Sequence, residues 1–278
     1  MEFDRLLFGT AGIPLSTAKK NNPIEGVRRI HELGLDCMQL EFAHGVRMKD
    51  EVSSGLRKVS YELGVPLTSH GPYYINLNAR EQDKIDSSVE RIIQTAKISD
   101  LCGAESMTFH AAFYMKDSPY DVFDLVEKSL NIIEERLGRL DIEIELRPEL
   151  TGKTSQFGSL DELISLTKNV TSCAPCMDFS HLFARTGLYN DYDGFIEVLK
   201  RLEEELDPMS LKNMHIHLSG ISSTSKGDLK HLNLDDSDFN WKDLLKALKD
   251  LDCRGYVICN SPNLEKDAQM MKDYYLSL

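Results

Sequence analysis

The feature that most constrains the fold of this chain is a regular alternation between short apolar segments and longer amphipathic segments. Eight apolar, β-rich segments begin about 30 to 40 residues apart, which leaves room for one strand, one helix and two loops in each repeat. Repeats of this kind predict parallel strands joined by helices. The predicted strands are Leu6–Thr10, Cys37–Phe42, Pro66–His70, Ser106–His110, Ile142–Leu146, Cys173–Asp178, Asn213–Leu218 and Gly255–Cys259.

The segments between these strands have the apolar spacing of helices that bury one face. Pro23–Leu33, for example, carries Ile24, Val27 and Ile30 at helical spacing. Gly34 follows this helix directly, at a position where a left-handed cap residue is expected, and Gly64 occupies the same kind of position. The other predicted helices are Ser87–Leu101, Val122–Leu137, Asp161–Thr167, Phe195–Leu206, Trp241–Leu251 and Leu264–Leu278.

The chain of 278 residues has no linker and no break in composition. We therefore predict an α/β fold with a single (β/α)8 TIM barrel domain over residues 1–278. An open doubly wound sheet is the alternative, but it more often has five or six strands. No GxGxxG or GxxxxGK[ST] motif follows a predicted strand, so nothing favours a dinucleotide or P-loop site.

The charge balance limits the kinds of partner that the chain can bind. Its formal net charge is −13, which argues against a protein that holds nucleic acid mainly through a broad basic surface. It leaves open a site where metal cations supply the positive charge. No apolar run is long enough to span a bilayer, no signal peptide is visible, and six cysteines are too few for a disulfide scaffold. These features predict a cytoplasmic protein that is not bound to a membrane.

Polar side chains gather at the predicted carboxyl ends of the strands, where barrel enzymes carry their catalytic groups. Six of the eight histidines belong to this set. Imidazoles and carboxylates that converge from several strands form a set of metal ligands, because without cations they would repel or stay unsatisfied. The set comprises Glu41, His70, His110, Glu149, Asp178, His181, His215, His217, His231 and Asn260.

Other residues of these types have simpler interpretations. We expect His31 to lie on a helix surface and His44 to be an ordinary loop residue. Glu41 is either an additional ligand or the partner of a neighbouring histidine or arginine, and the second role is favoured. Cys173 and Cys176 have the spacing of half a zinc motif, but no second pair accompanies them, so we predict core cysteines.

Several stretches around the strand ends resemble the motifs of the endonuclease IV family of AP endonucleases, which belongs to the xylose-isomerase-like barrel superfamily. The most specific match is Thr68–Leu77, which is similar to the signature S-x-H-x-P-Y-x-I-N-L. The resemblance covers nearly the whole chain and implies the same barrel. The other matching stretches are Phe109–His110, Pro148–Lys153 with Phe157–Gly158, Met177–His181, His217–Gly220 and Ser261–Pro262.

The resemblance implies a centre of up to three divalent ions, usually Zn²⁺, with Mn²⁺ as another candidate. The sequence alone leaves the choice between His215 and His217 open. The implied ligand sets are His70, His110 and Glu149 for one ion; Glu149, Asp178 and His217 for a second; and His181 and His231, with Asp228 as a candidate partner, for a third.

Two positions depart from the family pattern. The family has a glutamate immediately before [ST]-P, and Asn260 stands there in this chain. An amide carries no charge, so the second ion would bind less tightly and activate water less. The third site normally uses D-x-H, but the segment from Asp228 to His231 is one residue longer. Either change is compatible with a subfamily of reduced or altered activity.

The function that the resemblance implies is hydrolysis of the phosphodiester 5′ to abasic or damaged sites in duplex DNA, a step of base excision repair. No obligate protein partner is evident. The alternatives are a metal-dependent sugar isomerase or epimerase on the same barrel, and an endonuclease IV homologue of low activity that binds lesions. The implied catalytic residues are Glu149, Asp178 and Asn260, and the implied DNA-contacting residues are Tyr73, Tyr74 and Arg47.

Overall fold

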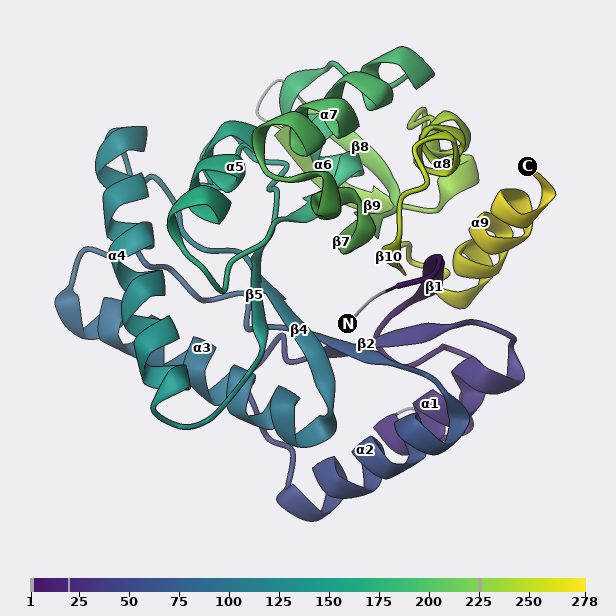
Figure 1. The fold of residues 1–278 in the computed structure, drawn as a ribbon, viewed down its shortest axis with the longest axis horizontal. Coiled ribbons are helices and arrows are strands. Elements are labelled where there is room, and N and C mark those ends of the chain that lie inside the picture. The colour runs from purple at the N-terminus through teal and green to yellow at the C-terminus, as the bar shows by residue number, and fades with distance from the viewer. Residues whose placement is uncertain (1–2, 20, 225–226) are drawn as a thin grey trace.

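Eight parallel strands form one sheet at the centre of the structure (Figure 1). The structure is a computed structural model and describes residues 3–19, 21–224 and 227–278, without the side chains of Asp228 and Leu229. All eight strands lie at or near the predicted positions. They are β1 (Leu6–Ala11), β2 (Cys37–Glu41), β3 (Leu67–His70), β4 (Ala104–Phe109), β5 (Glu145–Pro148), β6 (Cys176–Asp178), β7 (Met214–Leu218) and β10 (Gly255–Cys259).

The strands are hydrogen-bonded in the order β5-β4-β3-β2-β1-β10-β7-β6. The two outer strands of this order meet through isolated parallel bridges, which pair Leu146 with Cys173 and Glu149 with Cys176. The sheet therefore closes on itself, and the predicted (β/α)8 TIM barrel is confirmed. We call the junction between β5 and β6 the seam, because bridges rather than a continuous ladder join the strands there.

Helices surround the barrel on its outer side (Figure 1). Their apolar faces pack on the strands in one hydrophobic core. Among the described residues, none of the helices is both long and apolar enough to cross a membrane. The helices are α1 (Pro23–Glu32), α2 (Asp50–Leu63), α3 (Gln82–Cys102), α4 (Pro119–Gly138), α5 (Leu160–Asn169), α6 (Phe179–Thr186), α7 (Tyr192–Glu205), α8 (Trp241–Asp250) and α9 (Glu265–Ser277), with short 3₁₀ turns at Pro208–Lys212 and Leu234–Asp236.

Local sequence explains where these helices begin and end. The side chain of Asn22 accepts hydrogen bonds from two backbone N–H groups in the first turn of α1. Ser159 and Glu162 form a reciprocal capping box at the start of α5. Gly34 and Gly64 have positive φ angles of 67° and 63°, as expected for residues that follow helices.

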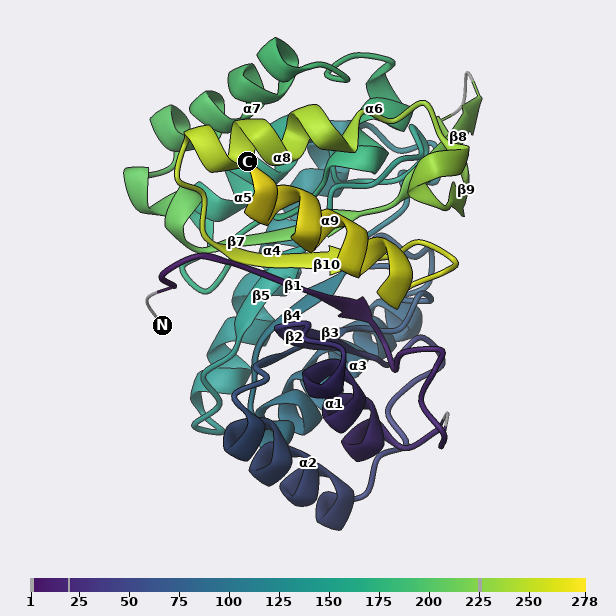
Figure 2. The same ribbon diagram turned by 90° about the vertical axis from the view of Figure 1, so that its right-hand side faces the viewer.

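The structure differs from the sequence prediction in the sixth repeat and in the loop after β7. Regular pairing of the sixth strand covers only Cys176–Asp178, because Pro175 has no N–H to donate to a ladder. The short helix α6 follows it at once and was not predicted. The segment after β7 is an antiparallel hairpin, β8 (Gly220–Thr224) with β9 (Gly227–Leu232), and it lies at the end of the barrel where the strand arrowheads point (Figure 2).

Candidate metal centre

Several of the predicted ligand residues reach one end of the barrel because they end a strand or follow it directly. His70 is the last residue of β3, and His110 and Glu149 directly follow β4 and β5. Together they border a cavity of about 380 Å³ at this end. The complete lining is Ala11, Gln39, Glu41, His70, Tyr73, His110, Glu149, His181, His231, Asn260 and Leu264.

The carboxylate of Glu149 is at the centre of this arrangement. Its Oε2 lies 3.0 Å from His70 Nε2 and 3.2 Å from His110 Nε2. Its Oε1 lies 3.2 Å from His217 Nδ1 and 3.5 Å from His181 Nδ1. Each carboxylate oxygen therefore faces a different pair of imidazoles, which is the geometry of a carboxylate that can bridge two cations.

Burial and charge act in opposite directions on Glu149, which is only 2% exposed. Burial alone would raise the pKa of its carboxyl group. The imidazoles of His217 and His110 outweigh burial and hold the pKa of Glu149 well below its ordinary value. The site is therefore built to keep a charged carboxylate away from water.

Three of the histidines are oriented by backbone carbonyl groups. A carbonyl oxygen only accepts hydrogen bonds, so the Nδ1 atom that faces it carries a hydrogen, and Nε2 is the nitrogen turned toward the other ligands. This leaves Nε2 available to a cation in each case. The contacts are His70 Nδ1 to the Gly71 carbonyl at 2.7 Å, His181 Nδ1 to the Leu150 carbonyl at 3.0 Å and His231 Nδ1 to the Asn260 carbonyl at 3.2 Å.

His181 and His231 bring two of these Nε2 atoms together. Their Nε2 atoms are 3.2 Å apart, and with Asp178 they form a group whose ligand atoms lie within 4.8 Å of one another. Burial and the neighbouring His181 lower the pKa of His231. His231 therefore stays neutral more readily than an ordinary histidine, and a cation could bind between the two nitrogens.

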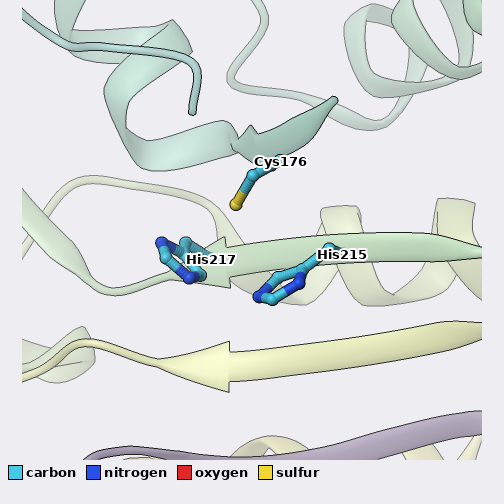
Figure 3. A group of neighbouring side chains, drawn as sticks. All are labelled: Cys176, His215 and His217. Atoms are coloured by element: carbon cyan, nitrogen blue, oxygen red, sulfur yellow. The ribbon is translucent and has the colours of Figure 1, made fainter. Parts of the chain in front are cut away.

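The structure also distinguishes His215 from His217, which both point into the barrel from β7 (Figure 3). Both ring nitrogens of His215 are engaged, Nδ1 with Ser106 Oγ at 3.2 Å and Nε2 with Gln39 Oε1 at 3.1 Å. His217 Nε2 lies 2.9 Å from the same Gln39 oxygen, while its Nδ1 faces Glu149. His217 is therefore the better ligand candidate.

Two buried atoms in the second ligand set have no well-aligned hydrogen bond among the described residues. They are Asp178 Oδ2 and His217 Nδ1. Each has a near neighbour, since Asp178 Oδ2 is 3.3 Å from His181 Nδ1, but the geometry is poor for a hydrogen bond. Together with Glu149 these residues form another compact group, so the donor set fits a divalent cation.

The remaining predicted ligands have different environments. Asn260 follows β10 and borders the cavity, and its buried side-chain Oδ1 has no hydrogen-bond partner among the described residues. The side chain of Asp228 lies outside the described part of the structure.

The three predicted DNA-contacting residues lie at or near the surface. Tyr73 is 54% exposed, borders the cavity, and has its ring centroid 5.3 Å from that of His70. Tyr74 is 49% exposed and lies under the guanidinium group of Arg91, 4.7 Å from the ring centroid. Arg47 is exposed in the segment before α2. Their contact with DNA stays a prediction.

The simpler interpretations of the other residues agree with the structure in most cases. His31 and His44 are exposed, on α1 and in a loop. Cys173 and Cys176 are buried free thiols, and Cys176 forms a compact group with the two imidazoles of β7 (Figure 3).

The expected partner of Glu41, a histidine or an arginine, is not the one that the structure gives it. The Nε2 of Gln39 donates a hydrogen bond to Glu41 Oε1 at 2.9 Å. Sequence reasoning missed Gln39 altogether. The available signal was its position two residues before Glu41, which places both side chains on the same face of β2.

Comparison with known proteins places this geometry among related barrels. A family model described as xylose isomerase-like TIM barrel matches residues 27–274. An uncharacterized protein of Methanocaldococcus jannaschii is 42% identical over 274 residues, which cover 98% of each chain. A probable endonuclease 4 of Aster yellows witches'-broom phytoplasma is 25% identical over 186 residues, 66% of this chain and 62% of the relative.

Two solved structures have similar folds. Endonuclease IV from Thermus thermophilus superimposes with a TM-score of 0.75 at 21% identity, covering 97% of this chain and 100% of that one. A D-tagatose 3-epimerase-like protein superimposes with a TM-score of 0.74 at 17% identity, covering 98% of this chain and 97% of that one. The two folds are matched almost equally well, so the function must be argued from the site.

Proposed function

Because this chain belongs to the xylose isomerase-like TIM barrel family, we propose that it is a metal-dependent endonuclease of the endonuclease IV type. It would hydrolyse the phosphodiester 5′ to abasic sites in duplex DNA. The observation that carries the proposal is the Glu149 carboxylate, whose two oxygens face separate pairs of imidazoles.

Three compact groups around the cavity support a centre of several ions. An enzyme that moves protons on a small sugar needs one or two divalent ions, whereas phosphodiester cleavage gains from ions that neutralise both the attacked phosphate and the leaving oxygen. Imidazole and carboxylate ligands suit Zn²⁺, and Mn²⁺ is the second candidate. The groups are His70, His110 and Glu149; Glu149, Asp178 and His217; and Asp178, His181 and His231.

Divalent ions held by these groups would supply Lewis acidity toward a phosphate. The residues of the chain hold and orient the ligand groups. Glu149 stays charged in a buried position and holds its neighbouring imidazoles in place. The buried Asp178 accepts the backbone N–H of His181 with Oδ1 at 2.7 Å, which leaves Oδ2 directed at the centre. Asn260 brings an amide to the cavity where a carboxylate would accept a proton.

A protein with a net charge of −13 can still bind an abasic site if it does not depend on a broad basic surface. Such a nucleotide leaves the helix easily because no base pair must be broken. The cations of the centre would attract the phosphate of the flipped nucleotide. Tyr73 stands at the cavity with half of its side chain exposed, where an aromatic ring can fill the gap in the stack.

The test is incubation of the Zn²⁺-loaded protein with a labelled duplex that carries one tetrahydrofuran site. We expect a single nick 5′ to the site, lost in H70A and in H217A and kept in the surface variant H44A. Intact duplex after incubation with protein of verified metal content would reject the proposal.

A sugar epimerase is the second candidate. The uncharged Asn260 and the likeness to the epimerase-like barrel favour it. The same protein preparation should therefore be incubated with ketohexoses, and the products separated by chromatography. Formation of an epimerised sugar without nicking of the duplex would reject the nuclease proposal and support the epimerase.

A further inference from the structure

Gln39 is a buried amide in the middle of the barrel whose hydrogen bonds are all directed at polar side chains. It belongs to β2 and is 1% exposed. Its Oε1 lies 2.9 Å from His217 Nε2 and 3.1 Å from His215 Nε2. Its Nε2 lies 2.9 Å from Glu41 Oε1. A buried amide with such contacts is held in one orientation.

Glu41 decides which way round the amide lies. A carboxylate oxygen only accepts hydrogen bonds, so the NH₂ group of Gln39 must face Glu41. The amide oxygen then faces the two imidazoles, and both must present N–H to it. His217 therefore carries hydrogen on Nε2, and Nδ1, the atom 3.2 Å from Glu149 Oε1, is the nitrogen that a cation can take.

This orientation is the reverse of that found in three other candidate ligand histidines. Backbone carbonyls hold His70, His181 and His231 through Nδ1, whereas His217 is held through Nε2 by a side chain. The difference follows from position: His217 lies within β7, where the backbone carbonyls are used by the sheet. A side chain from another strand must supply the acceptor, and β2 supplies it.

We propose that Gln39 is a positioning residue of the metal centre, which sets the tautomer of His217, and that Glu41 anchors its amide. The proposal rests on the metal centre of the proposed function and is independent of its DNA substrate. Partners of this kind typically change metal affinity about 10- to 100-fold when they are removed.

The first test replaces the amide by an apolar group of similar size. We expect Q39L to bind one Zn²⁺ ion about 10- to 100-fold more weakly than the wild type, in competition with a chromophoric chelator. In the Zn²⁺-loaded protein, ¹⁵N-imidazole NMR should show His217 with hydrogen on Nε2 in the wild type and the loss of this single state in Q39L.

A charge exchange separates positioning from packing. Q39E places two carboxylates in contact and should lower Zn²⁺ affinity. Q39E/E41Q restores every hydrogen bond. The carboxylate at position 39 still accepts from both imidazoles, and the amide at position 41 now donates to it, so only the hydrogen bond between positions 39 and 41 changes direction. We expect Zn²⁺ affinity near that of the wild type in this double variant.

S106A is the matched control, because it removes the other partner of His215 without touching His217. We expect it to leave Zn²⁺ affinity unchanged. Equal loss in S106A and Q39L, or wild-type affinity and tautomer in Q39L, would overturn the proposal. Since these readouts need no DNA, absence of nicking by the wild type would reject the proposed function and leave this inference standing.

Discussion

At the scale of single residues, the candidate centre is defined by the side-chain atoms that other hydrogen bonds leave available to a cation. Glu149 faces four imidazole nitrogens, and the Nε2 atoms of His181 and His231 are 3.2 Å apart. Asn260 is the exception, since its amide adds neither charge nor a proton acceptor. The first two predictions follow from these contrasts.

N260E should raise the rate of nicking at a tetrahydrofuran site. A carboxylate at this position restores a proton acceptor beside the centre, and general-base catalysis contributes roughly 10²–10⁴-fold where it operates. Single-turnover kinetics with verified metal content would measure the gain, with N169E on the exposed end of α5 as the control. An unchanged or slower rate in N260E would show that the position does not act on the reaction.

H231A should lose one bound ion and keep the others. His231 belongs only to the group with Asp178 and His181 among the described residues, so its removal leaves the other two groups intact. Elemental analysis after gel filtration would give the number of ions, with H44A for comparison. Loss of all ions, or of none, would contradict the division of the centre into separate groups.

The candidate ligands at the strand ends were predictable because histidines and carboxylates stand there directly after apolar strands. Gln39 was harder to predict, since its spacing from Glu41 is the only signal in the sequence and its two imidazole partners in β7 are 176 and 178 residues away. The choice of His217 over His215 likewise depends on Ser106 and Gln39, and only the fold brings them together.

At the scale of elements, the hairpin β8–β9 supplies the candidate ligand His231, which the barrel strands do not. It packs against α6, the helix that carries His181. Lys153, in the loop after β5, forms an isolated bridge with Gly227 of the hairpin. The position of His231 therefore depends on how closely the hairpin approaches that loop.

G227A should displace the hairpin and weaken the third ion site. Gly227 has φ +104°, and an added Cβ would lie 2.0 Å from the Gly152 carbonyl oxygen. G34A is the matched control, because Gly34 also has a positive φ but open space around its Cβ position. We expect one ion fewer in G227A and a full set in G34A; a full set in both would mean that the hairpin tolerates the shift.

The strands were predictable because each lies in or overlaps a short apolar, β-rich segment. The hairpin was not, since Gly220–Thr224 is short and rich in serine and threonine, without alternating apolar residues. The helix α6 is only 8 residues long and starts directly after the last residue of a strand, so its sequence alone indicates a loop.

At the scale of the whole molecule, the metal centre lies above the seam of the barrel. Glu149 directly follows β5, and Asp178 ends β6, the two strands joined by isolated bridges. Ions held by these two carboxylates together would connect the strands across the seam. Metal binding and barrel closure should therefore be coupled.

Removal of metal should lower the stability of the protein and loosen the seam first. A ligand present at 100 times its Kd stabilises the folded state by about 2.7 kcal/mol, which for a chain of this size corresponds to a Tm shift of several degrees. Calorimetry with and without a chelator would measure the shift. Hydrogen exchange should increase in β5 and β6 more than in β1 and β2, and a uniform increase would contradict the coupling.

The hairpin β8–β9 is an insertion between a strand and a helix, and the barrel is complete without it. If the proposed centre holds, replacement of this one loop would remove the third cation and leave the barrel and the other two ligand groups in place. The number of ions would then be set by a segment that the fold itself does not need.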